Sequence, residues 1–432
     1  MKTAAFYTLG CKVNQYETEA MAEMFKKRGY EIVDFSEPAD VYVINTCTVT
    51  SMSDRKSRQI IRRAKKLNPE GIVIAAGCYA QVAPDAVMDI EGVNLVVGTQ
   101  GKKNIVDEAE RLRSSDRSCL VSDISRRHEF EEMEISDYEG MTRAYIKIQE
   151  GCNQFCTYCI IPYARGPIRS REPDEVIKEA ARLAEDGFSE IILVGIHIAS
   201  YGLDNKRSSL SDIILEVNKL QGIKRIRLSS IEPMTLNSEF IEKIRPADKL
   251  CPHFHLSLQS GCDETLARMN RRYTTEQYAG IVRAIRTNFP GAAITTDVMV
   301  GFPGETEEEF LKSAEFVKEM RFADIHIFQY SRRPGTPAAD FPAQVSPEVK
   351  ERRSKRMEEI KRESMSRFLN SFIGREAEVL FEQPVHGRPG MFEGKTANYI
   401  TVRVKTDKDL SFRYERVIIE AVEEDGVMGV LL

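Results

Sequence analysis

The chain has 432 residues, of which 42% are hydrophobic and 29% charged, and its formal net charge is −5. At roughly 150 residues per domain, this length predicts about three domains with sizeable cores. The negative charge excludes a protein that coats nucleic acid with its whole surface, so any RNA contact must come from a local basic patch. No apolar run approaches the roughly 18 residues of a membrane span, and the run before Cys11 is too short for a signal peptide. We therefore expect a cytoplasmic protein with no membrane partner.

The first part of the chain alternates between strand-like and helix-like segments. Apolar runs predict buried strands, and the stretches between them predict helices. The predicted strands are 4–9, 41–45 and 72–76, and the predicted helices are 18–28, 54–67 and 84–90. This alternation is typical of a parallel α/β domain, which we place at residues 1–106. Residues 107–140 are highly charged, and we expect a connection there.

A second alternation begins at residue 144. The predicted strands are 144–149, 190–194, 225–229, 253–258, 294–300 and 324–328, with helices at 173–186, 276–288 and 305–320 among the stretches between them. Six βα units predict a partial (β/α)6 barrel or an open sheet within residues 141–372, because a full eight-unit barrel needs about 250 residues. One long charged helix, 346–372, ends this domain.

Residues 373–432 are rich in short strand-like segments. The predicted strands are 376–381, 399–404, 411–416 and 417–422, with turn signals at 387–390 and 424–426. This pattern predicts a small all-β barrel of the size that often binds nucleic acid.

The nine cysteines are an odd number in a chain without an export signal, which favours metal or redox use over disulfides. Cys152, Cys156 and Cys159 form a Cys-x3-Cys-x2-Cys run directly after the predicted strand 144–149. Three thiolates on one loop can hold three irons of a [4Fe–4S] cluster and leave the fourth iron open, whereas such clusters usually take four protein thiolates. A zinc site is the alternative, but it usually pairs two cysteines with a second pair or with histidines, and none lies nearby in the sequence.

This cysteine run resembles the signature of the radical S-adenosylmethionine (SAM) superfamily, and the resemblance covers residues 144–330. It implies that SAM binds the open iron and that one electron releases a 5′-deoxyadenosyl radical. Residues at or near strand ends resemble those that hold SAM in the superfamily. These candidate SAM-binding residues are Tyr158, Gly195, Ser230, Glu232, Gln259, Asp297 and Gly301. In the strand 253–258, His253 and His255 could be metal ligands, but hydrogen bonds that line a barrel are the favoured interpretation.

Cys11, Cys47 and Cys78 are far apart in sequence, yet each follows a predicted strand. Because the carboxyl ends of parallel strands meet at one edge of a sheet, we expect these three thiols to converge there. The alternative is three buried cysteines that pack as small apolar side chains. Cys119, Cys251 and Cys262 lack this context and are interpreted as structural.

The segments 8–18, 45–47 and 76–78 resemble the N-terminal domain of the methylthiotransferases, and the C-terminal barrel resembles their TRAM domain. The resemblance therefore covers essentially the whole chain. It implies an auxiliary [4Fe–4S] cluster on Cys11, Cys47 and Cys78, two SAM molecules per reaction, and a low-potential electron donor such as a flavodoxin or ferredoxin.

The segments 9–14, 153–155 and 227–233 are most similar to one branch of this family. That branch adds a methylthio group to C2 of N6-threonylcarbamoyladenosine at position 37, in the anticodon loop of tRNA. The alternatives are isopentenyladenosine in tRNA, an aspartate of a ribosomal protein, and a non-enzymatic iron–sulfur protein that binds RNA or carries electrons. The C2–H bond of adenine is unactivated, and acid–base catalysis at roughly 10²–10⁴-fold is too weak for it, so a cofactor radical suits the task.

One predicted helix is strongly basic. Residues 55–66 contain seven basic and no acidic side chains, and four of the basic ones fall on one helical face. These candidate RNA contacts are Arg55, Arg58, Arg62 and Lys66. A second basic stretch lies at 352–356, and both suit phosphate contacts, although a charge run is equally often a solvated face. The C-terminal barrel has eight basic and eleven acidic residues, so its RNA contact would be local, through Arg388, Lys395 and Arg403.

Overall fold

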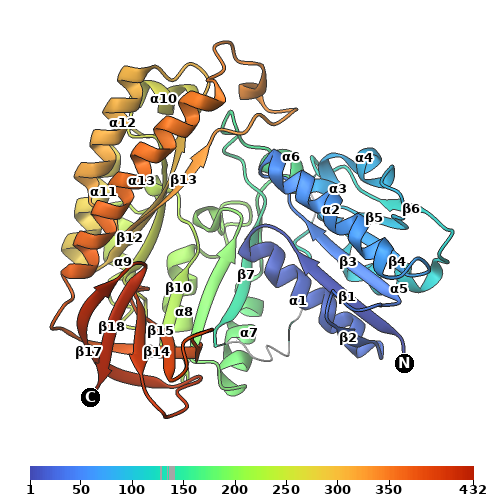
Figure 1. Ribbon diagram of the computed structural model, residues 1–432, viewed down its shortest axis with the longest axis horizontal. Helices are drawn as coiled ribbons and strands as arrows, with labels where there is room; N and C mark the ends of the chain where they lie inside the picture. Colours follow the sequence, from blue (N-terminus) through green and yellow to red (C-terminus); the bar gives the residue numbers. More distant parts are fainter. Residues whose placement is uncertain (127–128, 134, 136–141) are drawn as a thin grey trace.

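The computed structural model describes residues 1–126, 129–133, 135 and 142–432. It contains an N-terminal α/β unit, a central open barrel and a small closed C-terminal barrel (Figure 1). Within this part of the chain, no helix combines the length and apolar character needed to cross a membrane. Part of the expected connection at 107–140 lies outside the described residues, and its first part contains the end of one helix and a short strand.

The N-terminal unit is a six-stranded parallel sheet in the order β2-β1-β3-β4-β5-β6. The strands are β1 (Thr3–Thr8), β2 (Glu31–Val33), β3 (Val41–Thr46), β4 (Ile72–Gly77), β5 (Leu95–Val97) and β6 (Ser118–Leu120). The helices are α1 (Lys12–Lys27), α2 (Ser51–Leu67), α3 (Cys78–Val82), α4 (Pro84–Met88), η1 (Lys102–Asn104) and α5 (Ile105–Arg111). Successive residues of β3 enter two separate apolar clusters, one on each face, as a sheet covered on both sides requires.

Helix α1 begins at Lys12, six residues earlier than the predicted start at residue 18. Its first turns bury the polar side chains Asn14 and Glu17. Polar residues at buried positions break the apolar period that marks a helix in sequence, so the start of α1 was missed.

The central barrel is open and has six parallel strands. They are β7 (Ala144–Glu150), β9 (Glu190–Gly195), β10 (Arg225–Leu228), β11 (His253–Gln259), β12 (Ala293–Val300) and β13 (Asp324–Gln329), with the short β8 (Arg169–Ser170) antiparallel beside β7. The sheets β10-β9-β7-β8 and β11-β12-β13 are joined by the bridges Ile226–Leu250 and Ile231–Leu256. The partial barrel expected from six βα units is therefore confirmed.

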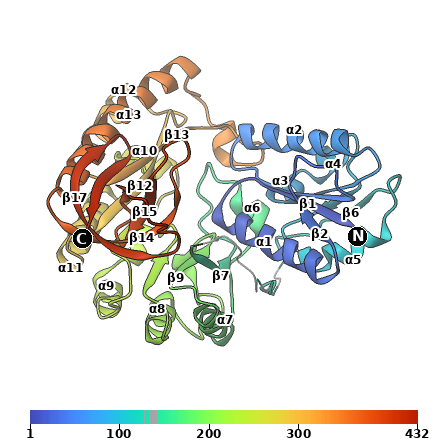
Figure 2. The ribbon, with the colours of Figure 1, turned by 60° about the horizontal axis from the view of Figure 1, so that its bottom comes forward.

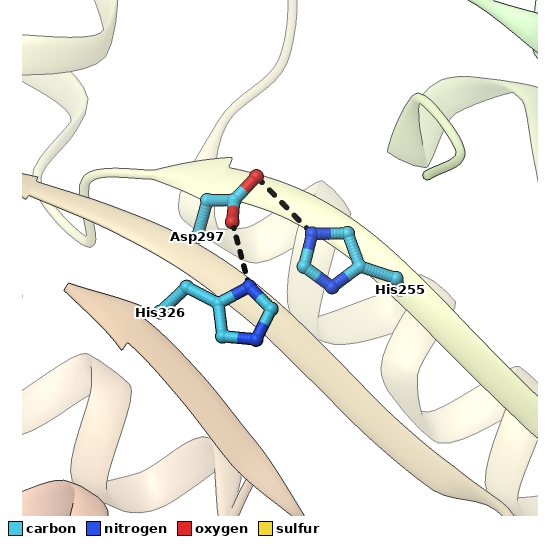
Figure 3. A group of neighbouring side chains, drawn as sticks. All are labelled: His255, Asp297 and His326. Carbon is cyan, nitrogen blue, oxygen red and sulfur yellow. Dashed lines mark ion pairs between the residues drawn. The ribbon is translucent and has the colours of Figure 1, made fainter. Parts of the chain in front are cut away.

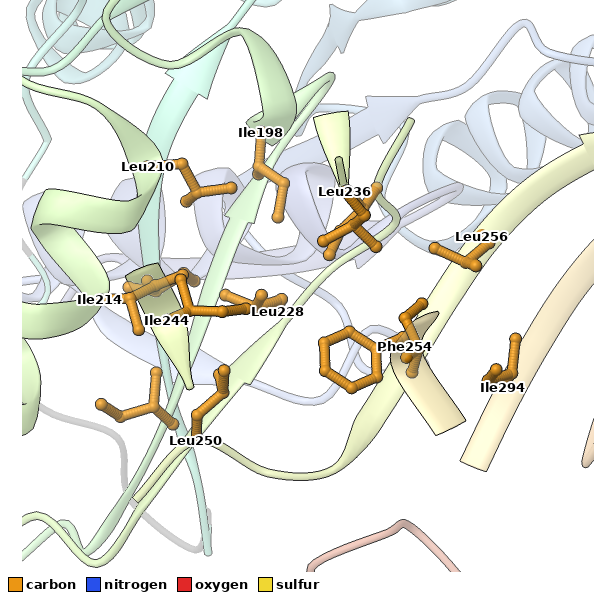
Figure 4. Close-up of a cluster of buried hydrophobic side chains, with 14 of the residues drawn as sticks. Ile198, Leu210, Ile214, Leu228, Leu236, Ile244, Leu250, Phe254, Leu256 and Ile294 are labelled. Atoms are coloured by element: carbon orange, nitrogen blue, oxygen red, sulfur yellow. The ribbon is translucent and has the colours of Figure 1, made fainter. Parts of the chain in front are cut away.

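The helices of the central unit lie mostly on the outside of this barrel. They are α6 (Ile161–Arg165), α7 (Pro173–Glu185), η2 (Ile198–Ser200), α8 (Leu210–Lys219), η3 (Pro233–Thr235), α9 (Ser238–Ile244), α10 (Asp263–Arg268), α11 (Thr275–Asn288), α12 (Glu307–Met320), η4 (Pro337–Asp340) and α13 (Pro347–Asn370). Capping boxes start α8, α11 and α12, with Ser209, Thr274 and Thr306 as the capping residues. Leucine, isoleucine and phenylalanine side chains pack between strands and helices (Figure 4).

The C-terminal unit is a closed barrel in the order β14-β15-β16-β18-β17. Its strands are β14 (Glu376–Pro384), β15 (Met391–Thr396), β16 (Thr401–Lys405), β17 (Tyr414–Glu423) and β18 (Gly426–Leu431). The predicted strands 411–416 and 417–422 are wrong as two elements, because β17 runs through both. Strands β15 and β18 were missed because they contain glycines, and Gly394 of β15 lies where a Cβ atom would meet the carbonyl oxygen of Leu380.

The two outer units lie on opposite sides of the open barrel (Figure 2). Helix α1 of the N-terminal unit contacts β7 and β9. On the other side, Arg225 and Arg227 of β10 donate hydrogen bonds to carbonyl oxygens of the C-terminal barrel. A cavity bordered by all three units is the result.

Candidate active site

Cys152, Cys156 and Cys159 lie on the loop that follows β7. Gly151 has a φ of +75° at the start of this loop, and a Cβ atom there would meet the carbonyl oxygen of Pro167. The hydroxyl and backbone N–H of Thr157 donate to the carbonyl oxygens of Arg268 and Met269, which ties the loop to the far side of the barrel. The loop thus holds its three thiols in a fixed arrangement.

Cys11, Cys47 and Cys78 follow β1, β3 and β4, which are neighbours in the parallel sheet. The structure brings these three residues together, as the strand-end argument predicted. Gly10 has a φ of +104°, and a Cβ atom there would lie 2.9 Å from the Cys47 Sγ atom. Cys47 and Cys78 are buried, whereas Cys11 is exposed.

The chemistry of both sets fits an iron–sulfur cluster. Burial raises the pKa of Cys78 and Cys152 to about 11 and that of Cys159 to about 12. Thiolates at such sites need a strong positive partner, which iron supplies. Each set offers three thiols, so a four-iron cluster would keep one open iron.

The other three cysteines lie away from both sets. Cys119 is exposed in β6, Cys251 is buried, and Cys262 donates to the Glu264 carboxylate at 2.9 Å. Their interpretation as structural residues stays a prediction.

Two arginines that sequence reasoning missed contact the two cysteine sets. Arg165 of α6 donates from Nε to Cys78 Sγ at 3.2 Å, and Arg271 donates from Nη1 to Cys156 Sγ at 3.4 Å. Arg271 also binds the Glu232 carboxylate at 2.8 Å. Each guanidinium group would stabilise negative charge on a ligand sulfur. No sequence motif marks either arginine, because each contact joins distant parts of the chain.

Arg165 belongs to a fully buried ionic network between the N-terminal unit and the central barrel. It binds Glu17 and Glu150, each at 2.5 Å, while Lys147 binds the same two carboxylates at 3.0 and 2.7 Å. Lys102 completes the network with Glu17 at 2.9 Å. Burial alone would raise the pKa of Glu17, but these cations hold it well below its usual range. The network fixes one cysteine set relative to the other.

A cavity of about 920 Å³ lies between the three units. Of the six clustered cysteines, Cys11 is the one among its lining residues. The candidate SAM-binding residues Gly195, Ser230 and Asp297 also line it. The neighbouring Ser229 hydroxyl is buried and has no hydrogen-bond partner among the described residues, so this wall has an unused polar group for a ligand.

The other candidate SAM-binding residues lie around the cysteine loop or beyond it. Glu232 binds Arg271, and the Tyr158 ring packs edge-on against Phe302 with centroids 6.5 Å apart. Gln259 ends β11 with a φ of +69°. Gly301 faces α13, where a Cβ atom would meet the Lys350 side chain. Of these candidates, Gly301 has the surroundings that least suit contact with SAM.

Asp297 lies between two histidines inside the cavity (Figure 3). Its carboxylate is 3.1 Å from His255 Nε2 and 3.4 Å from His326 Nδ1. His255 also shares a hydrogen bond of 2.9 Å with Thr295. Hydrogen bonds to Asp297 raise the pKa of His326. His255, Asp297 and His326 also offer ligand atoms within 4.8 Å of one another, an arrangement that suits a metal ion as well as hydrogen bonds of the barrel wall, so the interpretation of His255 stays a prediction.

His253 meets the C-terminal barrel. Its ring lies 4.9 Å from the Tyr399 ring, and burial lowers its pKa well below the usual value. On the same side, burial and then the Arg227 and Arg143 guanidinium groups lower the pKa of Lys12. Burial also lowers the pKa of Lys395. Cations therefore gather on this wall of the cavity.

The candidate RNA contacts differ in their availability. Arg55, Arg62 and Lys66 are exposed on α2, whereas Arg58 donates to the Tyr79 hydroxyl at 3.0 Å. Arg388 is exposed and 3.3 Å from Glu423. Lys395 lines the cavity and does not share the outer surface with them.

Two further arginines named from the sequence are engaged within the protein. Arg353, in the basic stretch of α13, is buried and binds Glu305 at 2.7 Å. Arg403 binds Asp425 at 2.7 Å. The expectation that the whole stretch 352–356 is available to phosphate is therefore wrong for Arg353.

Comparisons with known proteins agree with this architecture. Residues 146–317 match the family described as the Radical SAM superfamily, and residues 3–98 match the Uncharacterized protein family UPF0004. The chain is 45% identical over 97% of its length to the Threonylcarbamoyladenosine tRNA methylthiotransferase MtaB of Bacillus subtilis (strain 168), covering 94% of that protein. It is 35% identical over 98% of its length to a tRNA-2-methylthio-N(6)-dimethylallyladenosine synthase of Acetivibrio thermocellus, covering 89% of that protein.

Among solved structures, the radical S-adenosylmethionine methyltransferase TsrM from Kitasatospora setae, with cobalamin and a [4Fe-4S] cluster bound, has a similar fold. The TM-score is 0.58 at 18% identity, over 78% of this chain and 77% of that chain. The likeness supports the arrangement of an α/β unit beside an open barrel. With the long matches to these two relatives and the two cysteine sets, the chain belongs to the methylthiotransferase family of radical SAM proteins.

Proposed function

We propose that this enzyme adds a methylthio group to C2 of N6-threonylcarbamoyladenosine at position 37 of tRNA. The observation that carries the proposal is the pair of three-thiol sets, held in fixed relation by a buried ionic network beside one cavity. The relative at 45% identity is named for this substrate, and the relative at 35% identity is named for the dimethylallyl nucleoside, which makes the latter the second candidate.

Each unit of the chain would have its own role in this reaction. Residues 1–106 would hold the auxiliary [4Fe–4S] cluster on Cys11, Cys47 and Cys78, and residues 141–372 would hold the second on Cys152, Cys156 and Cys159. Residues 373–432 would help to hold the tRNA. Residues 107–140 would connect the first two units.

A cluster held by Cys152, Cys156 and Cys159 would, together with SAM and one electron, supply a carbon radical. The protein positions the reactants around that step. Arg271 stabilises the charge on Cys156 and orients the Glu232 carboxylate. Asp297, held by His255 and His326, presents a charged carboxylate to the cavity.

Partners outside the chain follow from the same scheme. The exposed basic face of α2, with Arg55, Arg62 and Lys66, suits the phosphates of the tRNA. A flavodoxin or ferredoxin would deliver the electron near the cysteine loop, where the Phe155 side chain is half exposed.

The experiment is expression in a bacterium deleted for its own methylthiotransferases, followed by mass spectrometry of nucleosides from total tRNA. We expect 2-methylthio-N6-threonylcarbamoyladenosine with the wild-type chain and none with Cys11→Ala or Cys156→Ala. Appearance of the 2-methylthio-isopentenyl nucleoside instead would favour the second candidate. If neither nucleoside appears while SAM is still cleaved in vitro, tRNA is not the substrate.

A further inference from the structure

The cavity contains two lysines without an acidic partner. Its lining carboxylates are all engaged: Asp297 with two histidines, Asp324 with Lys361 at 3.2 Å, and Asp425 with Arg403 at 2.7 Å. Lys12 and Lys395 also line the cavity, and neither forms an ion pair among the residues that the structure describes. The nearest polar contact of Lys395 is the Thr401 hydroxyl, at 2.5 Å.

The wall behind these lysines has further positive charge. Arg143 and Arg227 share the Glu190 carboxylate, each at 2.5 Å, and Arg143 also binds Glu382 at 2.7 Å. Arg225 also pairs with Glu190 at 3.5 Å and with Glu378 at 3.1 Å, so three carboxylates balance three guanidinium groups. Lys12 and Lys395 thus remain as cavity-lining ammonium groups without an ion pair among the described residues, which favours an anionic ligand between them.

Tyr399 is the centre of this wall. Its ring lies 4.6 Å from the Arg227 guanidinium and 5.2 Å from Lys395 Nζ. Its backbone has a φ of +69°, in the left-handed region that residues other than glycine rarely adopt. Tyr399 and Lys395 both line the cavity, so the ring and the ammonium group face the same space.

We propose that Lys12 and Lys395 form a carboxylate-binding subsite that recognises the threonyl carboxylate of the substrate nucleoside. This inference rests on the proposed function, and it assigns the specificity for the N6 substituent to one lysine from the N-terminal unit and one from the C-terminal barrel. Neither lysine would be a catalytic residue, because each contacts a part of the substrate that does not react.

The chemistry of the base favours this ligand over a backbone phosphate. In adenine, C2 and N6 lie on the same edge of the base, whereas N9 carries the sugar and its phosphates at the opposite edge. Lys12 directly follows Cys11, a proposed ligand of the auxiliary cluster. A base whose C2 approaches that cluster must therefore bring its N6 substituent into the same cavity.

The test compares anticodon stem-loop RNAs on the reconstituted holoenzyme. Three RNAs are used, with position 37 as N6-threonylcarbamoyladenosine, as its neutral methyl ester, or as unmodified adenosine. Dissociation constants are measured for the wild type, Lys12→Met, Lys395→Met and the charge-preserving Lys12→Arg. Lys361→Met is the matched control, because Lys361 lines the same cavity but is paired with Asp324. Iron content and 2-methylthio product are measured for each variant.

The wild type should prefer the free carboxylate over its methyl ester by about tenfold or more, as expected for one charge-assisted hydrogen bond. Lys12→Met and Lys395→Met should lose this preference with full iron content, while Lys12→Arg and Lys361→Met should keep it. Equal weakening of all three RNAs by Lys12→Met would identify a backbone phosphate as the ligand and overturn the inference. An unchanged preference in both methionine variants, with product still formed by the wild type, would overturn the inference alone. Absence of product from the wild type would overturn the proposed function as well.

Discussion

The two cysteine sets reach similar chemistry by different routes. Cys152, Cys156 and Cys159 lie within eight residues on one loop, so the chain itself keeps them together. Cys11, Cys47 and Cys78 come together because β1, β3 and β4 are parallel neighbours in a sheet. The first set therefore depends on local geometry and the second on the fold of a whole domain.

The surroundings of the sets differ in the same way. Arg165, beside Cys78, is fully buried with two carboxylates at the boundary between two units. Arg271, beside Cys156, lies within the central barrel and its partner Glu232 is partly exposed. Removal of corresponding groups from the two sets should therefore have unequal effects on stability.

The largest expected effect is loss of one cluster at a time. Cys156→Ala and Cys78→Ala should each remove about half of the bound iron and abolish the methylthio product, because each set holds one cluster. Iron and sulfide analysis with electron paramagnetic resonance checks this. Cys119→Ala is the control, since this exposed cysteine lies outside both sets. Loss of all the iron from Cys78→Ala would contradict the independence of the two sets.

The second comparison replaces each of the two arginines in turn and measures the stability of the protein. Arg165→Met should lower the free energy of unfolding by about 3–5 kcal/mol, because it leaves buried Glu17 and Glu150 without a principal partner. Arg271→Met should cost less, about 1–3 kcal/mol, because water can reach Glu232. Urea denaturation of the two anaerobic apo-proteins measures both. Arg165→Lys keeps the positive charge but loses the planar guanidinium group that binds two carboxylates at once. The stability of this variant should therefore lie between those of the wild type and Arg165→Met. Equal losses for the two methionine variants would refute the contrast.

A third comparison concerns the glycine that precedes Cys78 and lets the backbone pass close to the neighbouring strand. Gly77 precedes Cys78 with a φ of +95°, and a Cβ atom there would lie 2.8 Å from the Thr46 carbonyl oxygen. Gly77→Ala should cost about 1–3 kcal/mol from strain and should selectively lose the auxiliary cluster. Gly29→Ala separates strain from collision, because Gly29 has a φ of +87° but nothing within 4 Å. The melting temperature and the iron content should change less in Gly29→Ala than in Gly77→Ala. Equal changes in the two variants would show that the collision with the Thr46 carbonyl is unimportant.

The smallest effect lies in the cavity that Cys11 borders. Asp297 raises the pKa of His326, and Asp324 and Lys361 are the other charges near it. A folded-state pKa above the unfolded value means that protonated His326 stabilises the protein below that unfolded value, near 6.5, and that this stabilisation is lost as pH rises through the folded-state pKa. Nuclear magnetic resonance titration should show a large fall of the His326 pKa in Asp297→Asn. Asp324→Asn should cause a smaller fall, and the reverse order would assign the shift to Asp324.

The sequence was sufficient where a function depends on short spacing or on strand order. The loop of Cys152, Cys156 and Cys159 follows from spacing alone. The convergence of Cys11 with Cys47 and Cys78 follows from strands that end before each residue. The partial barrel follows in the same way from six strand patterns.

Other features could not be predicted because they depend on contacts between distant residues. Arg165 reaches Cys78 across 87 positions, and Arg271 reaches Cys156 across 115 positions. The start of α1 was hidden because Asn14 and Glu17 are polar residues buried at a domain boundary. Strands β15 and β18 of the C-terminal barrel could not be predicted because their glycines interrupt the strand pattern. Ionic networks between units follow from three-dimensional packing, which no local pattern records.

The most direct test of the two-set account is one reaction mixture in which two products are counted. Reconstituted enzyme is incubated with SAM, a chemical reductant and an anticodon stem-loop bearing N6-threonylcarbamoyladenosine, and 5′-deoxyadenosine and the 2-methylthio nucleoside are quantified by mass spectrometry. We predict both products from the wild type, 5′-deoxyadenosine alone from Cys78→Ala, and neither from Cys156→Ala. Methylthio product from Cys78→Ala, or 5′-deoxyadenosine from Cys156→Ala, would contradict the separate roles assigned to the two cysteine sets.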